Sequence, residues 1–259
     1  MKKFITMLLA IALMLTCFTA CGAKDDSDMA YVKKNGKIVV GITDYAPMDY
    51  KDENGEWTGF DAEFARAVAA ELGVEAEFIE IDWDNKFFEL ESGAIDCVWN
   101  GMTITDEALK NADVSDPYVV NAQVVVMDKS KLADYPDAAS MADLVFAAEA
   151  SSAGEMAIAE GSGAANCTSV LTQADALLEV ASGSADACVI DITMANAMTG
   201  EGTSYAELGY AVSLTSEEYG IAFRQGSDLT AKVNELMAAM KADGTLQALA
   251  EKYSLTQAD

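Results

Sequence analysis

The sequence predicts an α/β protein built of two lobes that face each other. Two segments far apart in the chain, residues 87–100 and 177–191, share one pattern: a helix ends at Ser-Gly, and an Asp soon opens a short apolar strand. Gly just past a helix supplies the left-handed residue that ends it, and the apolar run suits a buried parallel strand. Each copy ends in a polar residue, Asn100 or Asp191, at the carboxyl end of a strand, where open α/β sheets bind ligands. The turn residues of ordinary βαβ units could repeat at this spacing by chance. The repeat alone therefore does not decide between two facing lobes and such a coincidence.

Hydrophobic patterning supports the same class along the whole chain. Short apolar runs predict strands, apolar residues at helical spacing predict helices, and Gly or Pro clusters mark the turns between them. In chain order we expect a strand at 37–42, a turn at 52–55, a helix at 60–72 ended by Gly73, strands at 77–81, 95–99 and 123–127, a polar loop-rich stretch at 129–143, a strand at 144–149, a helix from about 154, a strand at 169–171, a late strand at 219–223, a core helix at 229–240 ended by Asp243-Gly244, and a last short helix capped by Thr245.

The N-terminus is predicted to lie outside the fold. Met1-Lys2-Lys3 is a charged region before an apolar run at 4–18 that is too short to span a bilayer with ease. Residues 18–22, Phe-Thr-Ala-Cys-Gly, resemble a bacterial lipobox, although Phe stands where Leu is usual. We therefore expect a signal peptide at 1–20, lipid on Cys21 and a flexible tether at 21–28. Plain signal-peptidase cleavage and a retained signal anchor are the alternatives.

The chain is strongly acidic. With 16 Lys and Arg against 43 Asp and Glu, its formal net charge is −27. Removing residues 1–20 takes away two lysines and no acid, so the charge becomes 14 − 43 = −29. Such a surface repels nucleic acid and anionic lipid, so we expect no nucleic-acid partner.

Cysteine and histidine usage narrows the chemistry. The chain has no histidine, which excludes His-based triads and His-ligated zinc, and it has no CxxC or EF-hand loop. No metal and no cofactor is expected. Cys97 and Cys188 lie in apolar strands and are predicted to be buried, while the odd set of Cys97, Cys167 and Cys188 argues against full pairing and leaves their state open.

From about residue 36 to 253 the chain resembles the bacterial extracellular solute-binding proteins of the polar amino-acid type, which feed ABC importers. The order and spacing of several short segments carry this resemblance. They are Gly41–Met48, Gly59–Asp61, Asp82–Asp84, Gly101–Thr105, Ser115–Tyr118, Ser151-Ser152, Val189–Asp191 and Glu218–Ala222.

The resemblance implies a type II periplasmic-binding-protein clamshell with two hinge crossovers and a ligand in the interlobe cleft. Lobe 1 would comprise 29–121 plus 217–259, and lobe 2 would comprise 126–215. It further implies a monomeric, lipid-anchored protein outside the cell membrane. That protein would deliver an amino acid or a related polar or amine solute to the membrane subunits of an importer, with no catalytic residue.

The resemblance also implies the ligand-binding residues. Tyr45 and Trp83 would sandwich the ligand side chain, and Asp191 would hold an α-ammonium through a charge-assisted bond. Gly101 would offer a carbonyl to the ammonium and Thr103 a hydroxyl to the carboxylate, while Ser152 would lie at a helix N-terminus. The alternative for Asp191, as for any isolated Asp at a strand end, is that it caps the N-terminus of the following helix. The full implied set is Asp44, Tyr45, Trp83, Asn100, Gly101, Met102, Thr103, Ala108, Ser151, Ser152 and Asp191.

One position departs from the pattern. Ala108 stands where the family carries an Arg that grips the α-carboxylate, and an Ala offers neither the charge nor the fork of donors. Either Ser152, Thr103 and backbone N–H groups hold the carboxylate, or a lysine such as Lys86 does, or the ligand has no α-carboxylate. Lys86 itself is expected on the surface.

Two other functions remain as alternatives. A dehydratase-like enzyme on the same fold would need a buried acid/base pair, for which Asp191 and Asp44 are the candidates. A ligand-sensing domain would need a signalling partner.

Overall fold

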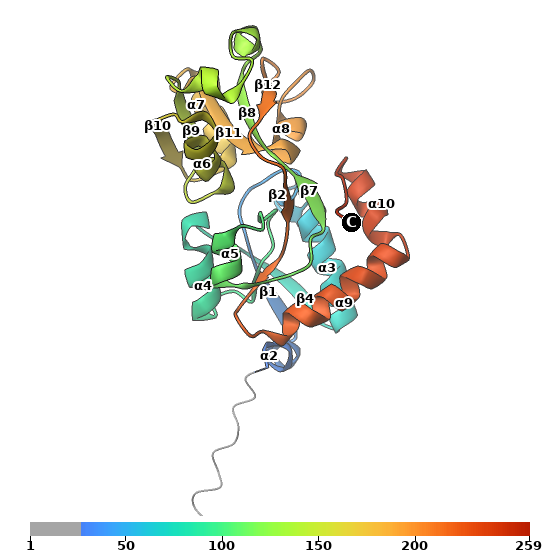
Figure 1. The fold of residues 1–259 in the computed structure, drawn as a ribbon. Helices are drawn as coiled ribbons and strands as arrows, with labels where there is room; N and C mark the ends of the chain where they lie inside the picture. Colours follow the sequence, from blue (N-terminus) through green and yellow to red (C-terminus); the bar gives the residue numbers. More distant parts are fainter. Residues whose placement is uncertain (1–26) are drawn as a thin grey trace, which may run out of the picture.

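The computed structural model describes residues 27–259, which form two lobes stacked one above the other in Figure 1. The predicted signal peptide at 1–20 and the predicted lipid site, Cys21, lie outside the described residues. No helix of the described part is long and apolar enough to cross a membrane.

The first lobe is built on a five-stranded sheet in the order β4-β1-β5-β14-β6. Strand β1 pairs in parallel with β4 and β5, whereas β14 runs antiparallel to β5 and β6. The strands are β1 (Lys37–Ile42), β4 (Glu75–Glu80), β5 (Cys97–Val98), β6 (Asp113–Val114) and β14 (Ala222–Phe223), and a small hairpin joins β2 (Tyr50–Lys51) to β3 (Trp57–Thr58).

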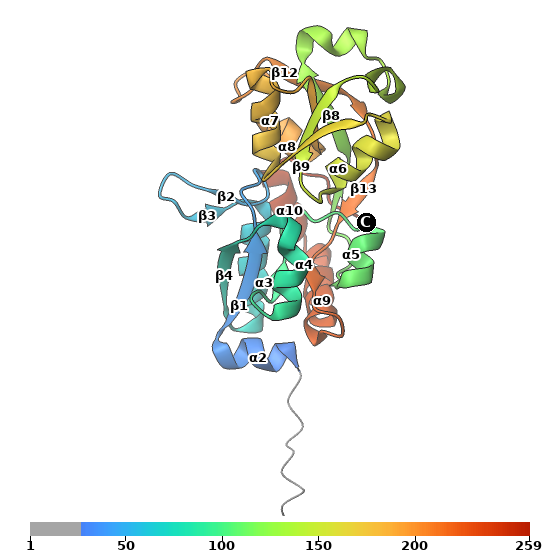
Figure 2. The ribbon, with the colours of Figure 1, turned by 90° about the vertical axis from the view of Figure 1, so that its left-hand side faces the viewer.

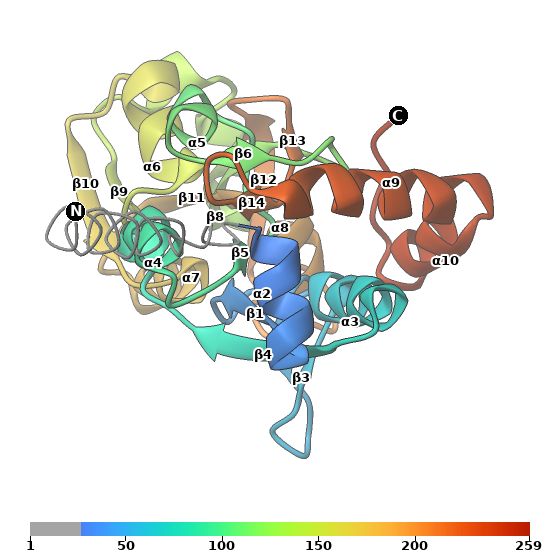
Figure 3. The same ribbon diagram turned by 90° about the horizontal axis from the view of Figure 1, so that it is seen from below.

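Helices cover both faces of this sheet. Helices α3, α9 and α10 pack together on one side, while α4 and α5 lie on the other, as the view from below shows (Figure 3). The helical segments are α2 (Asp28–Asn35), α3 (Phe60–Leu72), η1 (Trp83–Asn85), α4 (Lys86–Ser92), α5 (Asp106–Asn111), α9 (Asp228–Ala242) and α10 (Thr245–Lys252). The core helix predicted at 229–240 is confirmed in α9, whose Leu229, Val233, Met237 and Met240 are buried.

The second lobe has its own five-stranded sheet in the order β10-β9-β11-β8-β12. Figure 2 shows α6 on one side of it and α7 and α8 on the other. Its strands are β8 (Gln123–Asp128), β9 (Val145–Glu149), β10 (Asn166–Val170), β11 (Ala187–Asp191) and β12 (Leu208–Ser213). Its helices are α6 (Ala153–Ala157), α7 (Gln173–Ser182) and α8 (Ile192–Met198), with short segments η2 (Lys129–Asp134), η3 (Ala138–Met141) and η4 (Ile158–Ser162).

Two antiparallel strands connect the lobes: β7 (Val119–Asn121) and β13 (Glu217–Tyr219). They lie at the junction between the lobes, where Figure 1 labels β7 and Figure 2 labels β13, so the chain crosses twice, as a two-hinge clamshell requires. The predicted continuous strand at 219–223 is wrong. At Gly220 the N–H leaves the strand to donate to the Met102 carbonyl at 2.9 Å, and a Cβ there would meet Val114 Cγ1 at 2.6 Å.

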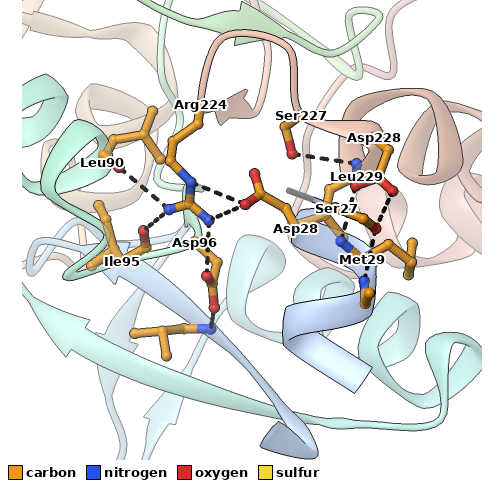
Figure 4. Close-up of polar contacts among 12 residues, drawn as sticks. Ser27, Asp28, Met29, Leu90, Ile95, Asp96, Arg224, Ser227, Asp228 and Leu229 are labelled. Carbon is orange, nitrogen blue, oxygen red and sulfur yellow. Dashed lines mark hydrogen bonds and ion pairs between the residues drawn. The ribbon is translucent and has the colours of Figure 1, made fainter. Parts of the chain in front are cut away.

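The predicted tether is wrong in its last two residues. Ser27 caps α2 by accepting a hydrogen bond from the Ala30 N–H at 2.9 Å, and its hydroxyl donates to Asp228 at 2.5 Å. Asp28 forms an ion pair with Arg224 at 2.9 Å (Figure 4). Polar composition suggested a tether, but these polar side chains have partners about 200 residues away in the sequence.

Smaller expectations resolve as follows. Cys97 and Cys188 are buried as predicted, and the described cysteines Cys97, Cys167 and Cys188 are free thiols. Thr245 does not cap the last helix, because Gly244 holds the N-cap position and Thr245 is the first helical residue.

Candidate binding cleft between the lobes

A pocket lies between the lobes and is lined by residues of both. It brings together ten of the eleven residues that the sequence implied, namely Tyr45, Trp83, Asn100, Gly101, Met102, Thr103, Ala108, Ser151, Ser152 and Asp191. Asp44 is the exception: it is exposed and does not line the pocket, because the chain turns its side chain outward just beyond β1. The lining also includes residues that the sequence did not single out: Thr43, Phe87, Thr105, Glu107, Gln123, Glu149, Ala153, Met156 and Gln173, and Lys86, which entered only as an alternative.

Asp191 lies at the end of β11 and is buried at the pocket wall. Its Oδ1 accepts hydrogen bonds from the amide groups of Asn121 and Gln123, and its Oδ2 accepts one from Gln173. Burial raises the pKa of Asp191 to about 6, and the negative charge of Glu217 adds to the rise. The carboxylate is therefore held in place by neutral donors and has no cation of its own among the described residues.

The same amides tie this carboxylate to the hinge. Asn121 on β7 and Gln123 on β8 also donate to Glu217 Oε1, at 2.7 and 2.6 Å. Glu217 belongs to β13, the second hinge strand, and Thr103 donates its hydroxyl to the same oxygen at 2.8 Å. The Thr103 proton expected for a ligand carboxylate is thus already used.

Asn100 was expected to face a ligand, but its side chain is fully engaged within the first lobe. Its Oδ1 accepts from the Thr43 N–H at 2.9 Å and from the Thr43 hydroxyl at 2.7 Å. Its Nδ2 donates to the Thr43 carbonyl at 3.2 Å and to Asp49 at 2.8 Å. Asn100 therefore joins the ends of β1 and β5 rather than presenting free donors.

The aromatic residues come from the first lobe. Tyr45 is buried, and its hydroxyl lies 2.5 Å from the Thr193 hydroxyl in the second lobe and 2.5 Å from that of Tyr219. Gly101, at φ 55°, lets the backbone approach this ring, since a Cβ there would lie 2.5 Å from Tyr45 Cε1. The hydroxyl bond to Thr193 joins the two lobes in a closed arrangement.

Lys86 is buried, so the expectation that it lies on the surface is wrong. Its ammonium donates to the carbonyls of Trp83 and of Ser151, each at 3.2 Å, and lies 4.8 Å from the Trp83 ring centroid. The first residue of α4 therefore reaches across the cleft to the second lobe. Two of its three N–H donors are used, which leaves one for a solute.

Ser151 and Ser152 form the opposite wall. Ser151 has a left-handed backbone, at φ 55°, and its hydroxyl donates to Asp84 of the first lobe. Ser152 is the N-cap of α6, since its Oγ accepts from the Glu155 N–H at 3.1 Å. A capping hydroxyl still has its own proton to donate, so Ser152 can bond a ligand oxygen.

Ala108 is buried in the first turn of α5 and lines the pocket. Lys86 and the acidic residues Glu107, Glu149 and Asp191 are the charged residues of the lining. No cluster of His, Cys, Asp or Glu within the described residues could hold a metal ion. Glu149 was missed by the sequence reasoning, although an acid that ends an apolar strand is the same signal that singled out Asp191.

The sequence and the fold were compared with those of known proteins. The family described as bacterial extracellular solute-binding proteins, family 3, matches residues 38–256. The L-cystine-binding protein TcyJ of Escherichia coli K12 is 30% identical over 232 residues, covering 88% of this chain and 86% of that protein. The arginine-binding extracellular protein ArtP of Bacillus subtilis is 30% identical over 263 residues, covering 98% of each. The solved structure of AncCDT-1, an ancestral amino acid-binding protein and precursor of cyclohexadienyl dehydratase, is 36% identical with a TM-score of 0.80, covering 88% of this chain and 99% of that one.

Proposed function

Because this chain belongs to family 3 of the bacterial extracellular solute-binding proteins, we propose that it captures a small amine-bearing solute, an amino acid or a related amine, and delivers it to an ABC importer. Its curated relatives are binding proteins of amino-acid transporters, and like them it is a binding protein rather than an enzyme. Asp44, one member of the acid/base pair considered for a dehydratase-like enzyme, lies outside the pocket.

The observation that carries this proposal is the buried carboxylate of Asp191. It lines the interlobe pocket, neutral amides orient it, and no described cation pairs with it. An ammonium group of the solute would supply the missing charge in a charge-assisted hydrogen bond. Closure of the lobes around the solute would then exclude water from this bond.

Among the side chains that the sequence reasoning offered for a ligand carboxylate, two can still donate a hydrogen bond in the cleft. The Thr103 hydroxyl already donates to Glu217, and Ala108 stands where the resemblance implied an Arg. Lys86 and Ser152 therefore remain as donors to the carboxylate. We propose that these two hold the carboxylate when the solute has one. A single lysine donor lacks the bidentate geometry of Arg, so this grip would be weaker.

A thermal-shift screen over amino acids, amines and small peptides tests the function, since a ligand that binds only the folded state raises the unfolding midpoint by mass action. Hits are then measured by calorimetry. If no compound with an amino group shifts the midpoint, while solutes without one do, the assignment of Asp191 as an ammonium site is wrong.

We also propose that the mature protein is anchored to the outer face of the cell membrane by lipid on Cys21. The charged and apolar leader before the lipobox-like residues supports this. Mass spectrometry of the protein purified from a bacterial host should find a lipidated N-terminal Cys21. A mature N-terminus downstream of Cys21 would contradict the anchor but leave the solute-binding function intact.

A further inference from the structure

Glu149 is a buried acid in the cleft that the proposed function does not use. It ends β9, is 4% exposed and lines the interlobe pocket. Its Oε1 atom is buried and has no hydrogen-bond partner among the residues that the structure describes. A buried polar atom without a partner costs about 1–3 kcal/mol, and more when it is charged, so native structures rarely keep one without a reason.

The protein supplies no counter-charge for this acid. No ion pair involving Glu149 forms among residues 27–259. The charges that act on it are those of Asp191, Asp175 and Asp82, all acidic, and of Lys86, whose ammonium donates to two carbonyls instead. Burial raises the pKa of Glu149 to about 8, Asp191 adds to the rise, and Lys86 opposes it.

Glu149 lies beside the proposed ammonium site. Strands β9 and β11 are adjacent and parallel, with Ala147 opposite Cys188, so Glu149 and Asp191 end neighbouring strands at the same edge of the sheet. Two carboxylates therefore line one wall of the pocket. Ala108, at the position where the resemblance implied an Arg, lines the same pocket from the first lobe.

We propose that the solute carries two cationic groups, one bound by Asp191 and the second by Glu149, as in a basic amino acid or a diamine. This inference rests on the proposed function and narrows its substrate class. The unpartnered Glu149 Oε1 would accept a hydrogen bond from the second ammonium or guanidinium. Pairing Glu149 with this cation would stabilise the complex, because a buried charge is stable only when an opposite charge or hydrogen-bond partner accompanies it.

A pair of ligands of nearly equal shape tests the charge requirement. L-Arginine and L-citrulline differ in that a cationic guanidinium replaces a neutral urea, and agmatine is arginine without its carboxylate. Calorimetry at pH 7 should find arginine bound at least roughly tenfold more tightly than citrulline, as expected for a desolvated charge pair. Agmatine then distinguishes the two sources of the same chemistry: binding as tight as that of arginine indicates a diamine site, and weaker binding indicates an amino-acid site.

Glu149→Gln removes the charge with little change in shape, and Glu160→Gln makes the same change on an exposed acid of the same lobe. Glu149→Gln should abolish the preference for arginine and leave citrulline binding within about twofold, while Glu160→Gln should leave the preference unchanged. Retained citrulline binding also shows that the variant is folded. Since the Oε1 of Glu149 has no partner in the free protein, Glu149→Gln should not lower the unfolding midpoint.

Proton release gives a second readout. At pH 7 a carboxyl with a pKa of about 8 is mostly protonated, and a cation bound beside it favours the ionised form, so arginine binding should release close to one proton. The apparent binding enthalpy of arginine should therefore differ between phosphate and Tris buffers for the native protein and much less for Glu149→Gln.

The outcomes separate the two proposals. If arginine and citrulline bind equally, or if Glu149→Gln keeps the preference, or if arginine releases no proton, the inference about Glu149 is wrong while solute capture stands. If no amine or amino acid binds at all, the proposed function fails. A collapse of the arginine preference in Glu149→Gln and not in Glu160→Gln supports both.

Discussion

The two lobes contain the same local segment, a helix ended by Ser-Gly and followed by an Asp and a strand. Gly93 ends α4 at φ 77°, and Gly183 ends α7 at φ 80°. Asp96 accepts a hydrogen bond from the N–H of the first lobe's strand β1 at 2.8 Å, and Asp186 accepts one from β9 of the second lobe at 3.1 Å. Identical local chemistry therefore ends both helices and places both strands.

The difference begins at the far end of each strand. In the first lobe Asn100 is bonded to Thr43 and Asp49, so the strand end stabilises the lobe itself. In the second lobe the strand ends carry Asp191, held only by neutral amides, and Glu149, whose Oε1 has no partner in the described chain. The polar side chain that ends the first copy of the motif is bonded within its own lobe, whereas the carboxylate that ends the second copy has no cationic partner among the described residues. The comparison teaches that a shared backbone motif fixes the position of a strand end, while the surrounding residues decide whether its polar side chain is available to a solute.

The largest expected effects come from substitutions at these two strand ends, one of which should reduce stability and the other solute binding. Asn100→Ala leaves the Thr43 N–H, the Thr43 hydroxyl and the Asp49 carboxylate without partners, and should lower the free energy of unfolding by about 3 kcal/mol. Asp191→Asn keeps one oxygen for Asn121 and Gln123 but loses the bond from Gln173, so it should lower the free energy of unfolding by less, about 1 kcal/mol, and should weaken solute binding roughly a hundredfold or more. Urea unfolding and calorimetry measure the two. The comparison is broken if Asp191→Asn binds normally.

The aromatic residues test the contribution of the first lobe to binding. Trp83→Ala and Tyr45→Ala should each cost about 2 kcal/mol of binding free energy, because cleft aromatics supply large apolar surfaces. Tyr45→Phe keeps the ring but removes the hydroxyl that lies against Thr193 of the second lobe, and should cost about 1 kcal/mol. Titration of the solute identified in the screen measures all three. If both Ala variants keep the native dissociation constant, the site is misplaced.

The two Asp residues of the shared motif should differ in their effect on stability. Asp96 is buried and also pairs with Arg224 at 3.2 Å, as Figure 4 shows, whereas Asp186 is only partly buried and pairs with Lys131 at 3.8 Å. Asp96→Ala should lower the free energy of unfolding by about 2 kcal/mol and Asp186→Ala by less than about 1 kcal/mol. Thermal and urea unfolding check this difference. Equal losses would mean that the Arg224 contact adds nothing.

The smallest expected effect concerns the missing cation of the first lobe. Amino acids with neutral side chains should bind weakly or not at all, because Ala108 stands where an Arg would grip their carboxylate, and Lys86 lacks the bidentate geometry of Arg. Ala108→Arg should strengthen their binding roughly tenfold, provided that the buried position accommodates the larger side chain. Calorimetry decides: submicromolar binding of such an amino acid by the native protein would show that the arginine is already replaced.

The sequence by itself predicted those features of the fold that depend on local patterns of residues. Hydrophobic periodicity located most of the strands of the two sheets and the helices α3 and α9, and Ser-Gly predicted the ends of α4 and α7 because a left-handed residue is a local requirement. The resemblance identified ten of the residues that line the pocket, because a strand end has a fixed place in this fold. Asp191 was found in this way, while its binding role stays a prediction.

Only the tertiary structure decided which polar groups are paired. The Lys86 ammonium is buried because it meets a carbonyl of Ser151, 65 residues away, and Ser27 and Asp28 join the fold through Asp228 and Arg224. Asn100 is satisfied and Glu149 is not, although both end strands beside the cleft. Periodicity reports which face of an element is buried, but hydrogen bonds between distant segments depend on where the folded chain brings their atoms. Which polar groups of the cleft lack a partner is therefore a property of the assembled lobes rather than of any one segment.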